Sequence, residues 1–82
     1  MKCLLLKNQK WVVSHIEEIE VEYELNMPNC KLTKPYLIDD EFNLTPWCNI
    51  TDDEEMMIFS EYIVTIVNPK PEIVEKYLKV TE

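Results

Sequence analysis

The chain has 82 residues, with 16 acidic and 8 basic side chains that give a formal net charge of −8, and it contains no Gly, Ala or Arg. Without Gly it can form no phosphate-binding P-loop, dinucleotide fingerprint or nucleophile elbow, because each needs backbone conformations that Gly alone tolerates. Without Arg it lacks the planar fork that binds phosphate or guanine with two hydrogen bonds. The acidic charge also opposes nonspecific binding to nucleic acid and attachment to anionic membranes.

The length of the chain predicts a single domain with a marginal core, which favours oligomerisation. The first apolar run, Cys3–Leu6, is too short for a secretory signal, and no run approaches the roughly 20 residues of a membrane span. We therefore expect a cytoplasmic protein. The cysteines Cys3, Cys30 and Cys48 form no Cys-x-x-Cys pair, so free thiols are expected in place of a disulfide framework.

β-Branched residues are abundant, and they predict a mostly β fold. A strand at Cys3–Leu6 is followed by a turn at Asn8–Gln9 and by a second strand that begins at Trp11. Polar and apolar residues alternate as far as Leu25, with a slip near Glu17–Glu18 where two polar residues adjoin. A helical spacing is also present, at Val13, Ile16, Ile19 and Tyr23. We favour the strand, with the helix as the alternative.

A turn at 26–29 leads to the last of the three strands predicted within residues 2–38, and Pro35 limits this third strand on one edge. Residues 39–55 are predicted to form a long polar loop that tucks apolar anchors against the body of the domain. These anchors are Phe42, Leu44, Trp47 and Ile50.

Residues 56–67 are predicted to supply two more strands, joined by a tight connection at Ser60–Glu61. Residues 71–80 then show the spacing of a short amphipathic helix, with Pro71 suited to its first turn and Lys79 to its last. The apolar stripe of this helix consists of Ile73, Val74, Tyr77 and Leu78.

Three segments carry a resemblance to a known family. Leu4–Gln9 and the strand after it are similar to a family pattern that consists of a strand, a Lys-Asn-Gly-type turn and a second strand. Pro28–Leu32 is similar to the Met-Asn loop and third strand of that family. Ile58–Ile66 keeps both spaced Ile positions of the family's Ile-Arg-Gly motif. The chain thus resembles the Sm-like (LSm) proteins, a family that includes the bacterial host-factor RNA chaperone, and most of all the small Sm-like proteins of marine cyanophages. The resemblance implies one Sm-like domain over 1–82: a small barrel of five strongly bent antiparallel strands, with a short C-terminal helix.

Members of that family bind RNA through an Asp and an Asn before the third strand and through Arg-Gly in the last hairpin. Here Asn29 matches the Asn, Glu22 or Glu24 stands in place of the Asp, and Phe59-Ser60 replaces Arg-Gly, so the cationic clamp is lost. Phe59 could stack on a base, although Phe on a strand is more often a core residue. The candidate RNA contacts are Asn29 and Phe59, which match family positions, and Lys31 and Tyr62, which are chosen for proximity.

The resemblance also implies a ring in which the fourth strand of one subunit pairs with the fifth strand of the next. The corresponding segments, 56–59 and 62–67, are apolar and carry few charges, and an exposed edge of that kind must be paired or it aggregates. We therefore expect a closed homo-oligomeric ring. Its expected interface residues are Met56, Met57, Ile58, Phe59, Ile63, Val64, Thr65 and Ile66.

Four chemical alternatives can be weighed against ordinary surface or core roles. His15-Ile16-Glu17 matches only the first half of a zinc-deaminase signature. His15 with the three cysteines lacks the two-residue knuckle of a zinc site, and Cys48 as a nucleophile would need His15 beside it in space. The acidic runs 39–41 and 52–55 lack the ligand pattern of a calcium loop. The ordinary role is favoured each time, so we expect no enzyme, no metal and no cofactor.

The tryptophans and acidic runs bear on assembly and partners instead. Trp11 is expected in the core, and Trp47 either in the core or at an interface. The leading hypothesis is a non-enzymatic Sm-like ring, with RNA as the ligand that the family implies. Two alternatives stay open: an acidic mimic of nucleic acid that inhibits a host protein through carboxylates at 17–24 and 52–55, and a purely structural ring. A phage-encoded chain would act in the host cytoplasm.

Overall fold

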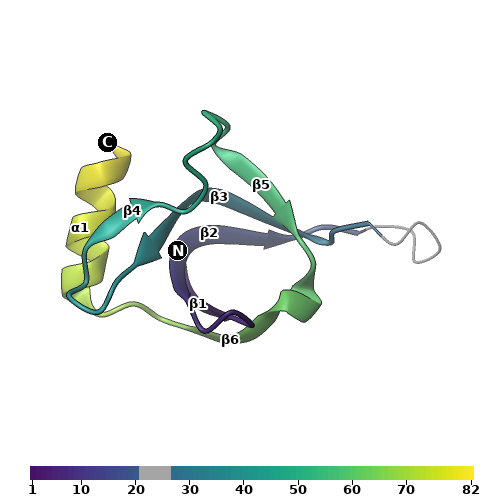
Figure 1. Cartoon of the computed structure of the whole chain (residues 1–82), viewed down its shortest axis with the longest axis horizontal. Coiled ribbons are helices and arrows are strands. Elements are labelled where there is room, and N and C mark those ends of the chain that lie inside the picture. Colours follow the sequence, from purple (N-terminus) through teal and green to yellow (C-terminus); the bar gives the residue numbers. More distant parts are fainter. Residues whose placement is uncertain (21–26) are drawn as a thin grey trace.

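The computed structural model describes residues 1–20 and 27–82 (Figure 1). It is mostly β with one C-terminal helix, as the sequence predicts. The elements are β1 (Lys2–Leu6), β2 (Trp11–Glu18), β3 (Cys30–Ile38), β4 (Leu44–Pro46), β5 (Glu55–Ile58), a 3₁₀ turn (Ser60–Tyr62), β6 (Ile63–Val67) and α1 (Pro71–Thr81).

The strands form one curved antiparallel sheet in the order β4-β3-β2-β1-β6, with β5 also paired to β3. β1 therefore lies between β2 and β6, and Cys3 pairs with Val13 on one side and Val67 on the other. The sheet is not closed, because within the described residues β5 pairs only with β3 and β6 only with β1. Within the described residues β5 and β6 each pair on one side only and so leave a free strand edge, as does the short β4.

β3 contains a bulge, which divides the strand into two halves with different partners. Val13 pairs with Tyr36 and His15 with Thr33, so Ser14 faces both Lys34 and Pro35. Lys34 adopts a positive φ of 54°, and the strand bends there. The first half of β3 pairs with β5 and the second half with β4. The bend allows β3 to continue through Pro35. The prediction of a slip near Glu17–Glu18 is wrong, because strand pairing is regular there.

Alternating residues of β1 and β2 contribute to two separate core clusters. The first cluster contains Leu4, Leu6, Val12, Cys30, Leu32 and Ile58. The second contains Cys3 and Val13, against which α1 packs Ile73 and Tyr77. The two clusters follow from the period of two along a strand, which sends neighbouring side chains to opposite faces of the sheet.

Two details of the predicted elements differ from the structure. A sixth strand, β4, lies within the segment 39–55 that was expected to be a loop, and it pairs with Tyr36–Ile38 of β3. Three of the expected anchors in this segment do pack against the two cores, but Ile50 is 90% exposed. β2 is a strand as far as Glu18, so the helical alternative is wrong there. The predicted strand runs on to Leu25, but Ile19 and Glu20 lie outside any strand, and 21–25 lie outside the described residues.

Two turns and the bulge in β3 require left-handed backbone in a chain without glycine. Gln9, Lys34 and Phe42 have φ values of 68°, 54° and 63°. A residue with a Cβ pays roughly 1–2 kcal/mol for this conformation. The turns around Gln9 and Phe42 are held by backbone hydrogen bonds, from Gln9 to Leu6 and from Phe42 to Asp39, each 3.0 Å long.

Candidate functional site

The loop before β3 and the turn before β6 meet at one end of the sheet through paired hydrogen bonds. The side-chain amide of Asn29 donates to Ser60 Oγ at 2.9 Å, and its Oδ1 accepts from the Ser60 backbone N–H at 2.7 Å. Asn29 thus fixes the start of the 3₁₀ turn from 31 positions away. We call this region, formed by Asn29 and residues 59–62, the corner.

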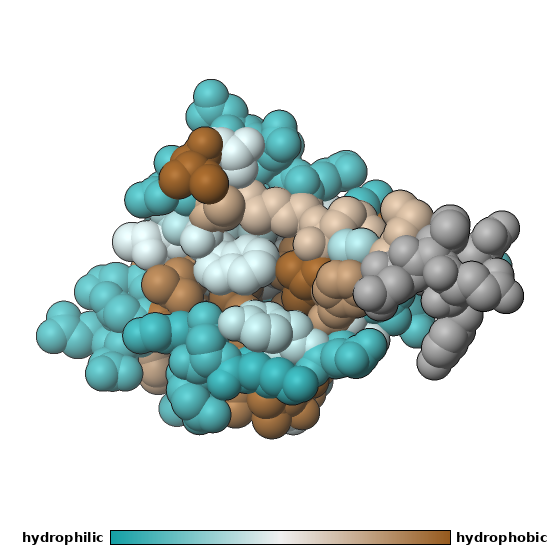
Figure 2. Space-filling model, turned by 45° about the vertical axis from the view of Figure 1, so that its right-hand side comes forward, coloured by the Kyte–Doolittle hydropathy of each residue, from teal (hydrophilic) through white to brown (hydrophobic). Residues whose placement is uncertain are grey.

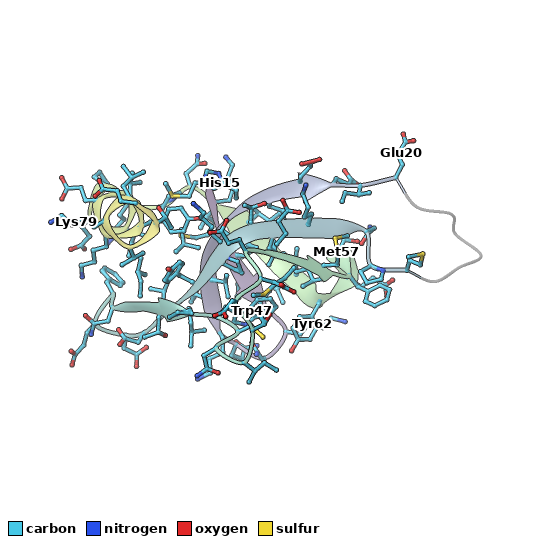
Figure 3. The ribbon with its side chains drawn as sticks, turned by 90° about the horizontal axis from the view of Figure 1, so that it is seen from above. His15, Glu20, Trp47, Met57, Tyr62 and Lys79 are labelled. Atoms are coloured by element: carbon cyan, nitrogen blue, oxygen red, sulfur yellow. The ribbon has the colours of Figure 1, made fainter. Side chains whose placement is uncertain are left out.

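Three of the four predicted RNA contacts lie at this corner. Phe59 precedes the 3₁₀ turn and Tyr62 ends it, and each is 38% exposed. The Tyr62 backbone N–H donates to the Phe59 carbonyl, and the Tyr62 carbonyl accepts from the Lys7 N–H, both at 3.0 Å. The turn is therefore held on the β1–β2 hairpin. Met57 and Tyr62 lie at the same end of the molecule, away from Lys79 of α1 (Figure 3).

The fourth predicted contact, Lys31, lies between two carboxylates. Its Nζ is 3.6 Å from Glu17 Oε2 and 3.8 Å from Glu55 Oε2, across the β2–β3–β5 ladder. Such half-exposed pairs add little stability, but they neutralise the lysine locally. Lys31 is therefore a weak candidate for a phosphate contact. Glu22 and Glu24, proposed in place of the family Asp, lie outside the described residues.

An open apolar groove of about 540 Å³ runs beside the free edge of β6. Its lining includes Ile16, Cys30, Ile63 and Ile66. Seen from the side on which the corner comes forward, apolar and weakly polar side chains gather in the middle of the surface between hydrophilic ones (Figure 2). Sequence reasoning missed Ile16 and Cys30 as groove residues, because their place beside β6 depends on the curvature of the sheet.

The expected interface residues divide into two groups. Ile58 is buried in the first core cluster, and Ile63 packs against that cluster, so both serve the core of their own chain. The others lie on β5, on β6 or, in the case of Phe59, directly after β5, with their side chains at or near the surface. Among them Met57 is 44%, Val64 56% and Ile66 48% exposed.

Cys3, Cys30 and His15, weighed above as chemical candidates, lie in different surroundings. Cys3 and Cys30 belong to different core clusters, and burial raises the pKa of each thiol, with the Glu18 carboxylate adding to the effect at Cys30. The His15 ring instead makes an edge contact with Tyr77, 5.7 Å between centroids. Within residues 1–20 and 27–82, no three His, Cys, Asp or Glu side chains are grouped so that they could hold a metal ion.

Comparison with protein families gives a match that covers the whole chain. No helix in the described part of the chain is long and apolar enough to cross a bilayer. No curated protein matches the chain significantly. The model of a family of unknown function, DUF6561, matches residues 1–82, and the chain therefore belongs to that family.

Proposed function

We propose that the chain is a non-enzymatic assembly module that forms a closed homo-oligomeric ring, in the manner of Sm-like proteins, in the cytoplasm. The observation that carries the proposal is the pair of free, apolar strand edges, on β5 and β6. A free edge presents unpaired backbone donors and acceptors, and pairing between copies would satisfy them. If the β5 edge of one chain pairs with the β6 edge of the next, the contact is head-to-tail, and it closes into a ring when the rotation between copies permits.

The order of the strands supports the Sm-like comparison. If the short β4 is left out, the strand order of the sheet is β5-β3-β2-β1-β6, with the first strand of the chain between the second and the last. A sharply bent third strand and a one-turn connection between the last two strands accompany this order. Under the proposal, each chain is a small open barrel with a gap between β5 and β6. The free edges of these two strands pair with strands of the neighbouring chains.

Side chains support the same arrangement. The groove beside β6 is apolar and open, and Met57 and Phe59 on the β5 side are exposed apolar residues that a neighbour could bury. Stable interfaces between proteins bury about 1,200–2,000 Å² in total and are apolar at their centre. Two paired strands with these side chains supply such a centre.

Light scattering after gel filtration tests the proposal. We expect one discrete mass at micromolar concentration, a fixed multiple of the 9.8 kDa chain. Met57→Lys combined with Val64→Lys should yield a folded monomer, because each lysine would be buried at the contact. Leu78→Lys on α1 is the matched control: Leu78 is equally exposed, at 53%, and lies away from both edges. A wild-type monomer would refute the ring.

RNA binding at the corner is a second candidate, favoured by the meeting of Asn29, Phe59 and Tyr62 there. Its support is limited to stacking and amide contacts, since Lys31 is paired with carboxylates. Filter binding with short U-rich and A-rich RNA at low salt tests it, with Tyr62→Leu as the variant. No binding at tens of micromolar would reject this ligand and leave the purely structural ring.

A further inference from the structure

At the opposite end of β2 and β3 from the corner lies a second cavity, of about 440 Å³. Its walls come from seven parts of the chain: β1, the start of β2, the end of β3, the turn after β3, the end of β6, the segment before α1 and the start of α1. We call it the end cavity. Pockets of about 300–1,000 Å³ with apolar walls and a few polar groups are typical of binding sites.

The end cavity combines aromatic rings with carboxylates. Trp11 and Phe42 line it, with Ile38 and Ile73 adding apolar surface. Asp39 and Asp40 stand at the same cavity. Rings beside carboxylates form an environment that attracts a cation with an apolar stem, through the negative faces of the rings and through charge.

The carboxylate of Asp39 is held in place by the turn that follows β3. Its Oδ1 accepts hydrogen bonds from the backbone N–H groups of Glu41, at 2.9 Å, and Asn43, at 2.8 Å. The bonds from Asn43 hold the pKa of this carboxyl below its ordinary value, with smaller contributions from the Glu41 N–H and Lys76. Asp39 therefore keeps its charge at neutral pH, while Asp40 is exposed beside it.

A cation of this chain forms part of the cavity wall. Lys70 lines the cavity, and the Lys70 ammonium lies over the Phe42 ring, 5.7 Å from the centroid. Lys70 is exposed and belongs to the segment that leads into α1. A contact of this kind at an exposed site is weak, so another cation can replace it. Lys76 does not line the cavity; it donates to the Phe42 carbonyl at 3.0 Å, and its charge contributes to the lowered pKa of Asp39.

We propose that the end cavity binds a lysine or arginine side chain of a basic partner protein, and that this side chain displaces Lys70 from the face of the Phe42 ring. The charge of the chain, −8, favours approach of a basic partner. The aliphatic stem of the incoming side chain would lie along Trp11 and Ile38, with its cation between Phe42 and the two carboxylates. The cavity meets the β6 edge only at Val67, the last residue of that strand, and the aromatic and acidic residues invoked here lie on neither β5 nor β6, so the site does not depend on the ring.

The two tryptophans make the test specific. A hexalysine peptide is titrated into ¹⁵N-labelled protein, and the two indole N–H signals are followed. Trp11 lines the end cavity, whereas Trp47 packs against the first core cluster. We expect the Trp11 signal to move in a saturable manner and the Trp47 signal to stay. A hexaglutamate peptide should move neither.

Substitutions distinguish binding at the end cavity from attraction to the acidic surface as a whole. Asp40→Asn and Phe42→Leu should each weaken hexalysine binding by about threefold, the size of one surface cation contact. Asp53→Asn, in the other acidic run, is the matched control and should leave it unchanged. Lys70→Met should tighten binding by about threefold, because it removes the competing cation. Equal movement of both indoles, or a Lys70→Met protein that binds no better than wild type, would overturn the proposal.

Discussion

The hydroxyl of Tyr77 is the polar contact that fixes α1 to the bulge in β3, and its removal should be measurable. Tyr77 is 1% exposed, and the single proton of its hydroxyl points to the Lys34 carbonyl at 2.9 Å, with the Thr33 carbonyl also near, at 3.2 Å. In Tyr77→Phe the Lys34 carbonyl loses this donor. We expect a loss of about 1.5 kcal/mol in the free energy of unfolding.

Urea and thermal unfolding followed by circular dichroism measure this loss. In a domain of this size, about 1.5 kcal/mol lowers Tm by roughly 6–12 °C. Wild type and variant must be compared at one protein concentration, because assembly would make Tm depend on it. Tyr36→Phe is the control: its hydroxyl donates to the exposed Val80 carbonyl at 3.2 Å, and its loss should change stability by less than about 0.5 kcal/mol.

The pH dependence of the free energy of unfolding is an independent test of the state of the Tyr77 hydroxyl. Burial, with a smaller contribution from Tyr36, raises the pKa of Tyr77 above its ordinary value of 10.0. Above pH 10 the unfolded chain loses this proton while the folded chain keeps it, so stability falls as pH rises, by up to about 1.4 kcal/mol per pH unit. Below pH 10 both states hold the proton and there is no effect.

Tyr77→Phe removes this slope, so the difference between wild type and variant should shrink from pH 9 to pH 11. All other residues are common to the two proteins, so their contributions cancel in the comparison. If Tyr77→Phe and Tyr36→Phe lose the same stability, or the two pH slopes coincide, then the hydroxyl of Tyr77 does not anchor the helix.

Three further outcomes follow from the fold. Gln9→Gly should raise the free energy of unfolding by up to about 1 kcal/mol in urea melts, because the φ of 68° suits glycine; an equal or lower value would contradict the strain argument. In native protein at pH 7.5, a disulfide reagent should modify Cys48 well before Cys3 and Cys30, which are buried with raised pKa values; three equal rates would be inconsistent with both cores. Leu32→Ala should cost about 2–5 kcal/mol by the same melts, whereas Leu78→Ala on the surface of α1 should cost little.

Periodicity predicted the elements whose side chains alternate or repeat clearly. The stripe around Ile73 and Tyr77 indicated the helix, and the apolar runs indicated β1, β5 and β6. β4 was missed because Leu44–Pro46 is too short to show a pattern and includes a proline, and its pairing with β3 supplies its structure. The bulge was misplaced because Ser14, a buried polar residue bonded to strand carbonyls, gives no signal in hydropathy.

The candidate site was predictable only where a local motif marked it. Asn29 and Phe59 were selected from separate segments, and the hydrogen bonds between Asn29 and Ser60 explain why they lie together. The pairing of Lys31 with Glu17 and Glu55 depends on strand register, which the sequence did not define at these positions. The end cavity draws on segments from Cys3 to Ile73, so no local pattern could reveal it.

The position of β1 between β2 and β6 bears on how the chain reaches its fold. Cys3 pairs with Val67, 64 positions later, and each core cluster needs a residue beyond position 57. No part of the chain up to β4 can complete either cluster, so folding should be all-or-none. Contacts of such separation close slowly, and we expect folding over milliseconds to seconds. Until β6 arrives, β1 is itself a free edge, and unfinished chains are the form most exposed to aggregation.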